Sequence, residues 1–177
     1  MWGLGVDTLP TRITSMGGKF LFTDDKETPE VQTSIYHWPE KKKIIQFEVR
    51  HWYTNDEYGA SVGNLFYGSE GVMVVKGYDT YEIYKKGEKT PSEKRTAGGD
   101  HFANWIKAVK SRKTADQHGP VETAHLSSSL AHLGNISDRL DRQMTFDPVK
   151  EKFVGDKEGD AMLTRKYRKG FEVPDKV

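Results

Sequence analysis

The stretch that decides the fold is residues 98–144, which read GGDHFANWIKAVKSRKTADQHGPVETAHLSSSLAHLGNISDRLDRQM. Its first half has a helical pattern, because apolar residues recur at steps of three and four and lysines occupy the other side. The apolar members are Phe102, Trp105, Ile106 and Val109. Asp100 precedes them and is a suitable N-cap. The pattern predicts an amphipathic helix over residues 100–112 with its apolar face buried.

A second helix is predicted over residues 121–141. Pro120 suits the position before a first turn, and Glu122 would meet the positive end of the helix dipole. One stripe is apolar and is expected in the core: Leu126, Leu130, Leu133, Ile136 and Leu140. Another stripe, about 120° around the helix, carries polar side chains: His125, Ser128, His132, Asn135 and Arg139. That polar stripe either faces the interior or the sheet, or is a docking face for a partner outside this chain.

The composition of the chain limits the classes of function. Its 177 residues are 35% hydrophobic, which suits one sizeable domain with a core. The 27 basic and 26 acidic residues give a net charge of +1, so we expect no nucleic-acid partner and no anionic-membrane partner. The absence of cysteine excludes disulfides and thiolate chemistry. No apolar run approaches the roughly 20 residues that span a bilayer, and the start lacks the pattern of a signal peptide; a cytoplasmic or periplasmic location stays open.

Residues 1–97 predict an α+β fold in which an open, mostly antiparallel β-sheet precedes the helices. We expect the sheet to extend from Arg12 to Tyr84, with both helices packed on one of its faces. A lysine-rich turn at 39–43 joins two long strands, the second of which alternates apolar and polar residues. The predicted strands are 12–14, 19–22, 31–38, 44–52, 64–67, 72–76 and 80–84.

The rest of the chain predicts little regular structure. Residues 85–97 are a charged connector, and residues 145–177 are expected to form a tail that wraps the body, with one short helix within 160–167. The whole chain, 1–177, is thus expected to be a single domain with 1–97 mainly sheet.

The segment from His51 to Gly63, HWYTNDEYGASVG, is the best candidate for a ligand-binding loop. It mixes aromatic and hydrogen-bonding side chains without the period of a helix or strand. Sugars and polyols are bound by groups that hydrogen-bond hydroxyls and by aromatic rings that cover apolar faces. The candidate substrate-binding residues are Arg50, His51, Trp52, Tyr53 and Asn55. The alternative is that the aromatic rings only cover the domain's own apolar surface.

No complete catalytic or metal site is visible in the sequence. Two glycine pairs do not form a nucleotide-binding loop: Gly3 and Gly5 lack the third glycine of the motif, and Gly68 and Gly71 lie in a predicted hairpin turn. Glu122 and His125 form one Glu-x-x-His pair, but a dimetal bundle needs a second copy and further carboxylates. His132 lies two turns beyond His125, about 10 Å along a helix, which is too far to share one zinc ion. We therefore predict no catalytic residue, no metal site and no cofactor site in this chain.

Several separated motifs resemble one family. They are GGDHFANWIKAVKSRK, then AHLSSSLAHLGNISDRL, then RQMTFDPVKEKFVGDKEGDAMLTRKYRKGFEVP, with DDKETPE and FYGSEGVMVVKGYDTYEIY before them. In this order they resemble the C-terminal part of bacterial NAD(P)-dependent oxidoreductases of the glucose-fructose oxidoreductase, inositol dehydrogenase and MocA family, written Gfo/Idh/MocA. The resemblance covers nearly all of the chain.

The resemblance implies a C-terminal domain without its N-terminal Rossmann domain. In that family the Rossmann domain holds NAD or NADP, and its Glu-Lys-Pro motif supplies the catalytic lysine. Residues 88–91, Glu-Lys-Thr-Pro, are only a near match, so the role is not assigned to Lys89. The family's C-terminal domain shapes a sugar or polyol pocket and builds a homo-oligomer. His125, His132 and Asn135 are the candidates for contact with the absent cofactor domain.

Three readings of the function remain. The first is a substrate-recognition and oligomerisation domain that is not catalytic by itself. The second is a free-standing sugar-binding or scaffold module with the same fold. The third is a self-sufficient enzyme, which would require a catalytic nucleophile or a group of metal ligands, and neither is visible in the sequence.

Overall fold

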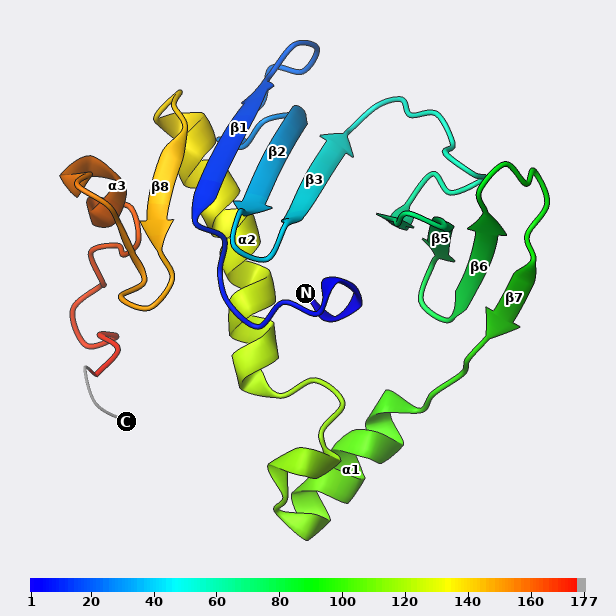
Figure 1. Ribbon diagram of the computed structural model, residues 1–177. Coiled ribbons are helices and arrows are strands. Elements are labelled where there is room, and N and C mark those ends of the chain that lie inside the picture. Colours follow the sequence, from blue (N-terminus) through cyan, green and yellow to red (C-terminus); the bar gives the residue numbers. More distant parts are fainter. Residues whose placement is uncertain (175–177) are drawn as a thin grey trace. The chain divides into compact units, whose positions relative to one another are not determined.

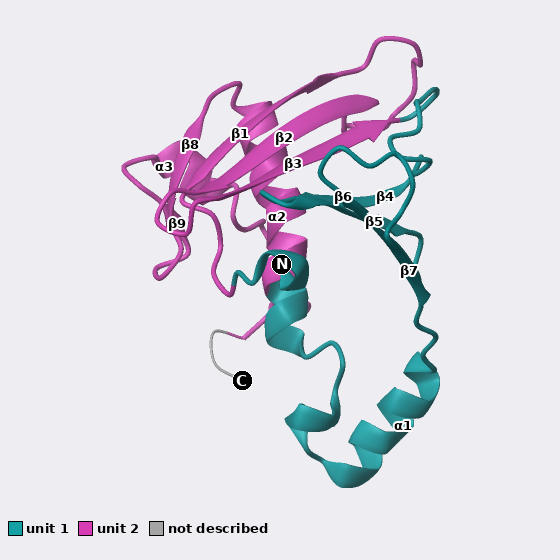
Figure 2. Ribbon diagram, turned by 45° about the vertical axis from the view of Figure 1, so that its right-hand side comes forward, with its two compact units in different colours: residues 1–6, 51–125 teal, residues 7–50, 126–177 magenta. Residues whose placement is uncertain are grey.

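A computed structural model describes residues 1–174, and its chain divides into two compact units (Figure 2). Unit 1 contains residues 1–6 and 51–125, and unit 2 contains residues 7–50 and the chain from Leu126 onward. The last part of the predicted tail, residues 175–177, lies outside the described residues.

Unit 2 is built on a five-stranded sheet in the order β3-β2-β1-β8-β9, with every pair antiparallel (Figure 1). The central strands pair over their full length, with Ser34 opposite both Ser15 and Phe47. The pairing fixes which side chains share a face, because alternate residues of a strand point to opposite sides. The strands are β1 (Arg12–Gly18), β2 (Val31–Trp38), β3 (Lys43–Arg50), β8 (Met144–Asp147) and β9 (Lys152–Phe153).

Helix α2 (Val121–Arg139) covers one face of this sheet with its C-terminal half. Leu133 and Ile136, two members of the predicted core stripe, are buried there, while Leu126 and Leu130 are half-buried. The sheet contributes the largest buried side chains of this core, which are Ile13, Tyr36, Trp38, Met144, Phe146 and Phe153. The second predicted helix is thus confirmed in position and in the face that it buries.

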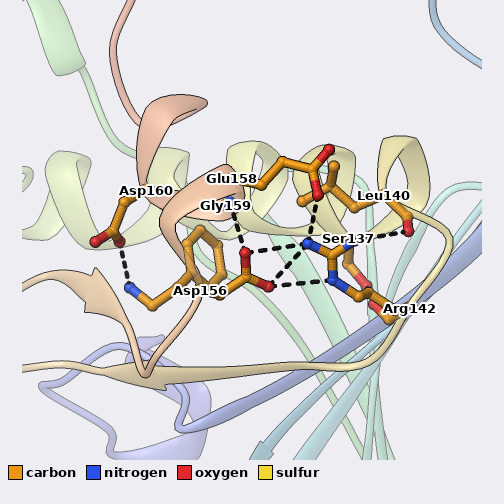
Figure 3. Close-up of polar contacts among 8 residues, drawn as sticks. Ser137, Leu140, Arg142, Asp156, Glu158, Gly159 and Asp160 are labelled. Carbon is orange, nitrogen blue, oxygen red and sulfur yellow. Dashed lines mark hydrogen bonds and ion pairs between the residues drawn. The ribbon is translucent and has the colours of Figure 1, made fainter.

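The chain after α2 is held to unit 2 by a cluster of charged side chains (Figure 3). The guanidinium of Arg142 binds both carboxylate oxygens of Asp156 at 3.0–3.1 Å and one oxygen of Glu158 at 2.8 Å. Asp156 also caps the short helix α3 (Lys157–Ala161) by accepting the Gly159 N–H at 2.9 Å. The pKa of Asp156 is lowered, first by that backbone N–H and then, against the effect of burial, by Arg142.

Unit 1 contains a four-stranded antiparallel meander in chain order. Its core is formed by Val72, Val74 and Tyr84, against which Ala60 and Leu65 pack. The strands are β4 (Gly63–Tyr67), β5 (Gly71–Lys76), β6 (Thr80–Lys85) and β7 (Glu93–Thr96). The helical elements are η1 (Trp2–Leu4), α1 (His101–Ser111), η2 (Thr114–Asp116) and the start of α2.

Helix α1 begins where the sequence predicted, with the Asp100 carboxylate accepting the Ala103 N–H at 2.9 Å. Its apolar side chains are not buried, since the exposed fraction is 69% for Phe102 and 67% for Trp105. The helix packs on η2 through hydrogen bonds of Asn104. The prediction that this helix covers a sheet was therefore wrong, because α1 follows an extended connector.

The predicted α+β class with open antiparallel strands is confirmed, but the single continuous sheet was wrong. Residues 51–62, between β3 and β4, form only one isolated bridge, so the strands pair as two separate sheets. Residues 19–22 form a turn rather than the predicted strand. The tail contributes β8 and β9 to the sheet, and its helix spans Lys157–Ala161 rather than lying within 160–167.

Among the described residues, no helix has both the length and the apolar character needed to cross a membrane.

Candidate functional site

A groove in unit 2, the α2 groove, lies between α2 and the neighbouring face of strands β2 and β3. Its volume is about 190 Å³ and it is open to solvent. Concave surfaces that combine apolar walls with a few hydrogen-bonding groups are the usual places for small ligands. The lining residues are Thr28, Pro29, Gln32, Ser34, Tyr36, Phe47, Val49, Ala131 and Asn135.

The floor of the α2 groove is a set of paired hydroxyl and amide groups on β1 and β2. The Ser34 hydroxyl lies 2.7 Å from the Ser15 hydroxyl, and the Gln32 carboxamide donates to the same Ser15 oxygen at 3.0 Å. Ser15 and Ser34 are both buried, so each hydroxyl needs such a partner. The floor is consequently polar but internally satisfied and rigid.

The helix approaches this floor closely at Gly134. A methyl group at Gly134 would lie 2.4 Å from the Tyr36 hydroxyl oxygen and 2.9 Å from the Ser34 hydroxyl oxygen. The Tyr36 hydroxyl donates to the Leu130 carbonyl at 2.7 Å, and burial raises the pKa of Tyr36. Only glycine leaves room for this contact between helix and sheet.

Asn135 is half-buried beside Gly134 and lines the α2 groove. The other members of its stripe that were expected to face a cofactor domain, His125 and His132, are exposed. The alternative that the polar stripe faces the sheet is therefore wrong for those two histidines. The structure places Asn135 at the groove and leaves the docking role of all three residues a proposal.

The aromatic and aliphatic walls of the α2 groove come from β3. Phe47 is 46% exposed and Val49 is 39% exposed, although both lie on the face that packs against α2. The register of the hairpin explains their position, because Phe47 pairs with Ser34 and Val49 pairs with Gln32. An apolar wall thus stands beside the hydroxyl and amide floor.

One end of the unit 2 sheet is organised by a buried carboxylate, Glu30. Its two oxygens accept the backbone N–H groups of Phe20, Leu21 and Phe22 at 2.8, 2.9 and 2.7 Å. Burial alone raises the pKa of Glu30, but the three backbone donors outweigh it, and the net pKa lies below the usual value. The carboxylate is therefore charged at neutral pH and holds this turn in one shape.

The predicted substrate-binding residues follow one another along the chain, with Arg50 in unit 2 and the other four in unit 1. Arg50 ends β3, and its guanidinium binds the Glu48 carboxylate at 2.9 Å. Trp52 is 43% exposed, Tyr53 is 72% exposed, and His51 and Asn55 are exposed as well. These side chains are accessible, and their role in binding stays a prediction.

Unit 1 contains an ion cluster around Glu82. The carboxylate lies 2.6 Å from Lys76 and 3.1 Å from Lys94, and it accepts the Tyr84 hydroxyl at 2.6 Å. Hydrogen bonds from Lys76, Tyr84 and Lys94, in that order, lower the pKa of Glu82 to about 2. All four groups lie on the core face of the meander, where Tyr84 also packs on Tyr58 with ring centres 4.9 Å apart. The cluster is a structural ion pair within the sheet.

The chemistry available in the α2 groove is binding rather than acid–base catalysis. None of its lining residues is a histidine, lysine, arginine, aspartate or glutamate. It offers hydroxyl and carboxamide groups and two aromatic rings, those of Tyr36 and Phe47, a set that suits a neutral polar ligand. Within residues 1–174, no cluster of three or more histidine and carboxylate side chains is placed to hold a metal ion.

The sequence prediction missed Gln32, Ser34 and Glu30 as organising residues. Gln32 and Ser34 alternate with apolar residues in a strand and look like its solvent face. A usable signal was the glycine of the helix, Gly134, since a helical glycine often marks a close approach to a neighbouring backbone or side chain. Glu30 could not be paired with a turn ten residues earlier without the fold.

Comparison with known proteins gives the following relatives. The family described as "Oxidoreductase family, C-terminal alpha/beta domain" matches residues 74–173. A "putative oxidoreductase" from Klebsiella pneumoniae is 13% identical with a TM-score of 0.52, and the match covers 88% of this chain and 47% of that one. Another, from Bacteroides fragilis, is 10% identical with a TM-score of 0.47, covering 78% and 45%. This chain thus spans about half the length of both. No curated protein matches the sequence.

Proposed function

The chain belongs to the Gfo/Idh/MocA oxidoreductase family as its C-terminal α/β domain, and from this premise we propose that it recognises the substrate and builds the oligomer of an NAD(P)-dependent oxidoreductase. The proposed substrate is a sugar or a polyol. The observation that carries the proposal is the match of the domain family to residues 74–173, which is more than half of the chain.

The catalytic parts belong, in this proposal, to an N-terminal Rossmann domain that is separate from these residues. The family is NAD(P)-dependent, and hydride transfer requires a cofactor held beside the reacting carbon. Residues 88–91, the near match to the family's Glu-Lys-Pro motif, lie in an exposed turn between β6 and β7. This position supports the assignment of no catalytic role to Lys89.

Two surfaces are proposed to meet the substrate and the cofactor domain. The exposed residues Arg50, His51, Trp52, Tyr53 and Asn55 are proposed to hydrogen-bond and cover the substrate. His125, His132 and Asn135 are proposed to contact the cofactor domain. The neutral polar lining of the α2 groove is compatible with hydroxyl groups near Asn135. The sheet face of unit 2 opposite α2 is proposed to mediate self-association, since an isologous two-fold pairing closes such a face.

Titration of the purified chain with NADH and NADPH tests whether cofactor binding belongs to the Rossmann domain alone. We expect no saturable binding at sub-millimolar affinity and no oxidation of sugars or polyols. Saturable nicotinamide binding by calorimetry would refute the proposal, because these residues would then hold a cofactor themselves.

The substrate-binding loop is tested in a protein that joins this chain to its cofactor domain. His51→Ala and Asn55→Ala are expected to lower kcat/KM by tenfold or more, which is about 1.4 kcal/mol of transition-state binding. Val149→Ala, at a residue that is 91% exposed in the turn between β8 and β9, is the matched control and should change nothing. An unchanged kcat/KM in folded loop variants would rule this loop out.

The same chain tests the second reading, a free-standing sugar-binding or scaffold module. That module would be favoured over the oxidoreductase domain if the isolated chain bound a sugar and if the gene encoded no Rossmann domain upstream of these residues.

A further inference from the structure

The α2 groove contains one polar side chain that the protein leaves unpaired. Asn135 is half-buried there, yet its carboxamide makes no hydrogen bond to any of residues 1–174. Asparagine is also a weak helix former, so α2 does not need it for its own stability. A polar group that is partly removed from water normally has a partner. The Asn135 carboxamide is therefore available to a ligand in the groove.

A second carboxamide lines the same groove from the sheet. Gln32 donates one amide N–H to the Ser15 hydroxyl at 3.0 Å, which leaves its carbonyl oxygen and its other N–H without a partner among the described residues. A carboxamide offers two N–H donors and an acceptor oxygen. Asn135 on the helix and Gln32 on β2 can therefore supply both the donor and the acceptor that a ligand amide requires.

The other walls of the groove are apolar, and none of its lining side chains is charged. Phe47 and Val49 are 46% and 39% exposed, and Pro29 and Ala131 complete the apolar lining. Apolar surface that is open to water favours contact with a methyl group or with the apolar face of a sugar ring. An ammonium or carboxylate group on the ligand would lose water here without meeting an opposite charge.

The size of the groove limits what it can hold. Its volume of about 190 Å³ equals about six water molecules at about 30 Å³ each, which suits one substituent and part of a sugar ring. The floor is fixed before binding, since the Tyr36 hydroxyl donates to the Leu130 carbonyl at 2.7 Å and the Ser34 hydroxyl lies 2.7 Å from that of Ser15. A preformed site loses little conformational entropy when a ligand enters it.

We infer that the α2 groove binds the acetamido group of an N-acetylated amino sugar. The ligand amide meets Asn135 and Gln32. Its methyl group packs on Val49, and the Phe47 ring covers the apolar face of the sugar. A sugar without this group leaves the two carboxamides unpaired, and a free amino sugar brings a positive charge that nothing in the groove compensates.

The inference rests on the proposed function and deepens it. It names the class of sugar and adds a group of substrate-binding residues to the predicted loop. In this arrangement Asn135 contacts the ligand, and His125 and His132 retain the proposed contact with the cofactor domain.

Saturation-transfer NMR with the purified chain tests the ligand class. N-acetylglucosamine is expected to bind with its methyl protons receiving the largest share of the saturation, and its dissociation constant should be at least tenfold below those of glucose and glucosamine. These three sugars differ only in the group on one ring carbon, so they isolate the acetamido group. Equal affinity for glucose, or no binding of N-acetylglucosamine at tens of millimolar, would overturn the inference.

Variants of Asn135 test the residues. Asn135→Ala removes the carboxamide, and Asn135→Asp keeps its size but removes the N–H donors. Each should raise the dissociation constant for N-acetylglucosamine at least tenfold, with an unchanged circular dichroism spectrum. Val149→Ala, in the exposed turn between β8 and β9, is the control and should leave the constant unchanged. Unchanged binding in both Asn135 variants would overturn the role of the groove, and loss of binding in Tyr53→Ala would then assign the sugar to the predicted loop.

The failure of this inference can be told apart from the failure of the proposed function. The proposed function is tested by the nicotinamide titration and by kcat/KM of His51→Ala and Asn55→Ala in the joined protein, and neither measurement depends on the groove. A chain that passes both of those tests but does not prefer N-acetylglucosamine would overturn the groove inference alone.

Discussion

Replacement of Gly134 by alanine is the most direct test of how α2 meets the sheet. The new methyl group would lie 2.4 Å from the Tyr36 hydroxyl oxygen and 2.9 Å from the Ser34 hydroxyl oxygen. Neither oxygen can withdraw freely. Tyr36 is 2% exposed and donates to the Leu130 carbonyl at 2.7 Å, while Ser34 is 1% exposed and paired with Ser15.

The expected change in the free energy of unfolding combines three effects. Overpacking of a dense core destabilises by about 1–3 kcal/mol, and displacement of the Tyr36 hydroxyl removes a hydrogen bond of about 1 kcal/mol. The intrinsic helix preference for alanine over glycine returns about 1 kcal/mol. Gly134→Ala should therefore destabilise unit 2 by about 2 kcal/mol.

Equilibrium unfolding in urea, followed by circular dichroism, measures this change. Tyr36→Phe removes the closest oxygen, so Gly134→Ala combined with Tyr36→Phe should be less destabilised than the sum of the single variants, by about 1 kcal/mol. Ser127→Ala, at an exposed position of the same helix, is the control for helix preference and should not destabilise. A Gly134→Ala variant as stable as wild type, or strict additivity in the cycle, would refute the close approach.

Three further outcomes are expected. The pKa of the Glu82 carboxyl is about 2 in the folded chain against an ordinary value of 4.5. The ionised carboxylate therefore stabilises the folded chain fully above pH 4.5, and this contribution is lost as the pH falls toward 2. In Glu82→Gln the melting temperature should fall less steeply with decreasing pH over this range than in the wild type. Asp156→Ala removes the α3 cap and should destabilise unit 2 by about 1 kcal/mol, visible as faster hydrogen exchange at Gly159; equal exchange rates would contradict it. Trp105→Ser should not lower the melting temperature, because Trp105 is 67% exposed; a loss of several degrees would show that it is buried.

The sequence was sufficient where structure follows from local pattern. Strand β2 was predicted with its observed bounds, and β5 and β6 were each within one residue at either end. Alternation in β3 predicted which residues face α2, and the Asp100 cap located the start of α1. These features depend on periodicity and capping, which act over a few residues.

The sequence was insufficient where partners are distant along the chain. Residues 19–22 have the composition of a strand, but three of their backbone N–H groups donate to the Glu30 carboxylate instead of to a neighbouring strand, so the segment forms a turn. Strands β8 and β9 are too short to show a strand period, and they form because β8 pairs with the edge of β1 at Met144 and Thr145 and β9 then pairs with β8. The helical period predicted the apolar face of α1, but it carries no information on which element packs against that face.

On α2, the residues that pack against the sheet and the residues of the exposed polar stripe lie on different sides of the helix. Unit 2 needs Leu133 and Ile136 for its core and Gly134 for the close approach to Tyr36. These requirements are met on one side of the helix, and His132 is exposed on another. The identity of His132 is therefore not dictated by the packing of unit 2, and a reason for it is more naturally sought in an interaction beyond this chain. This is why the proposed contact with a cofactor domain is placed on that stripe rather than on the buried one.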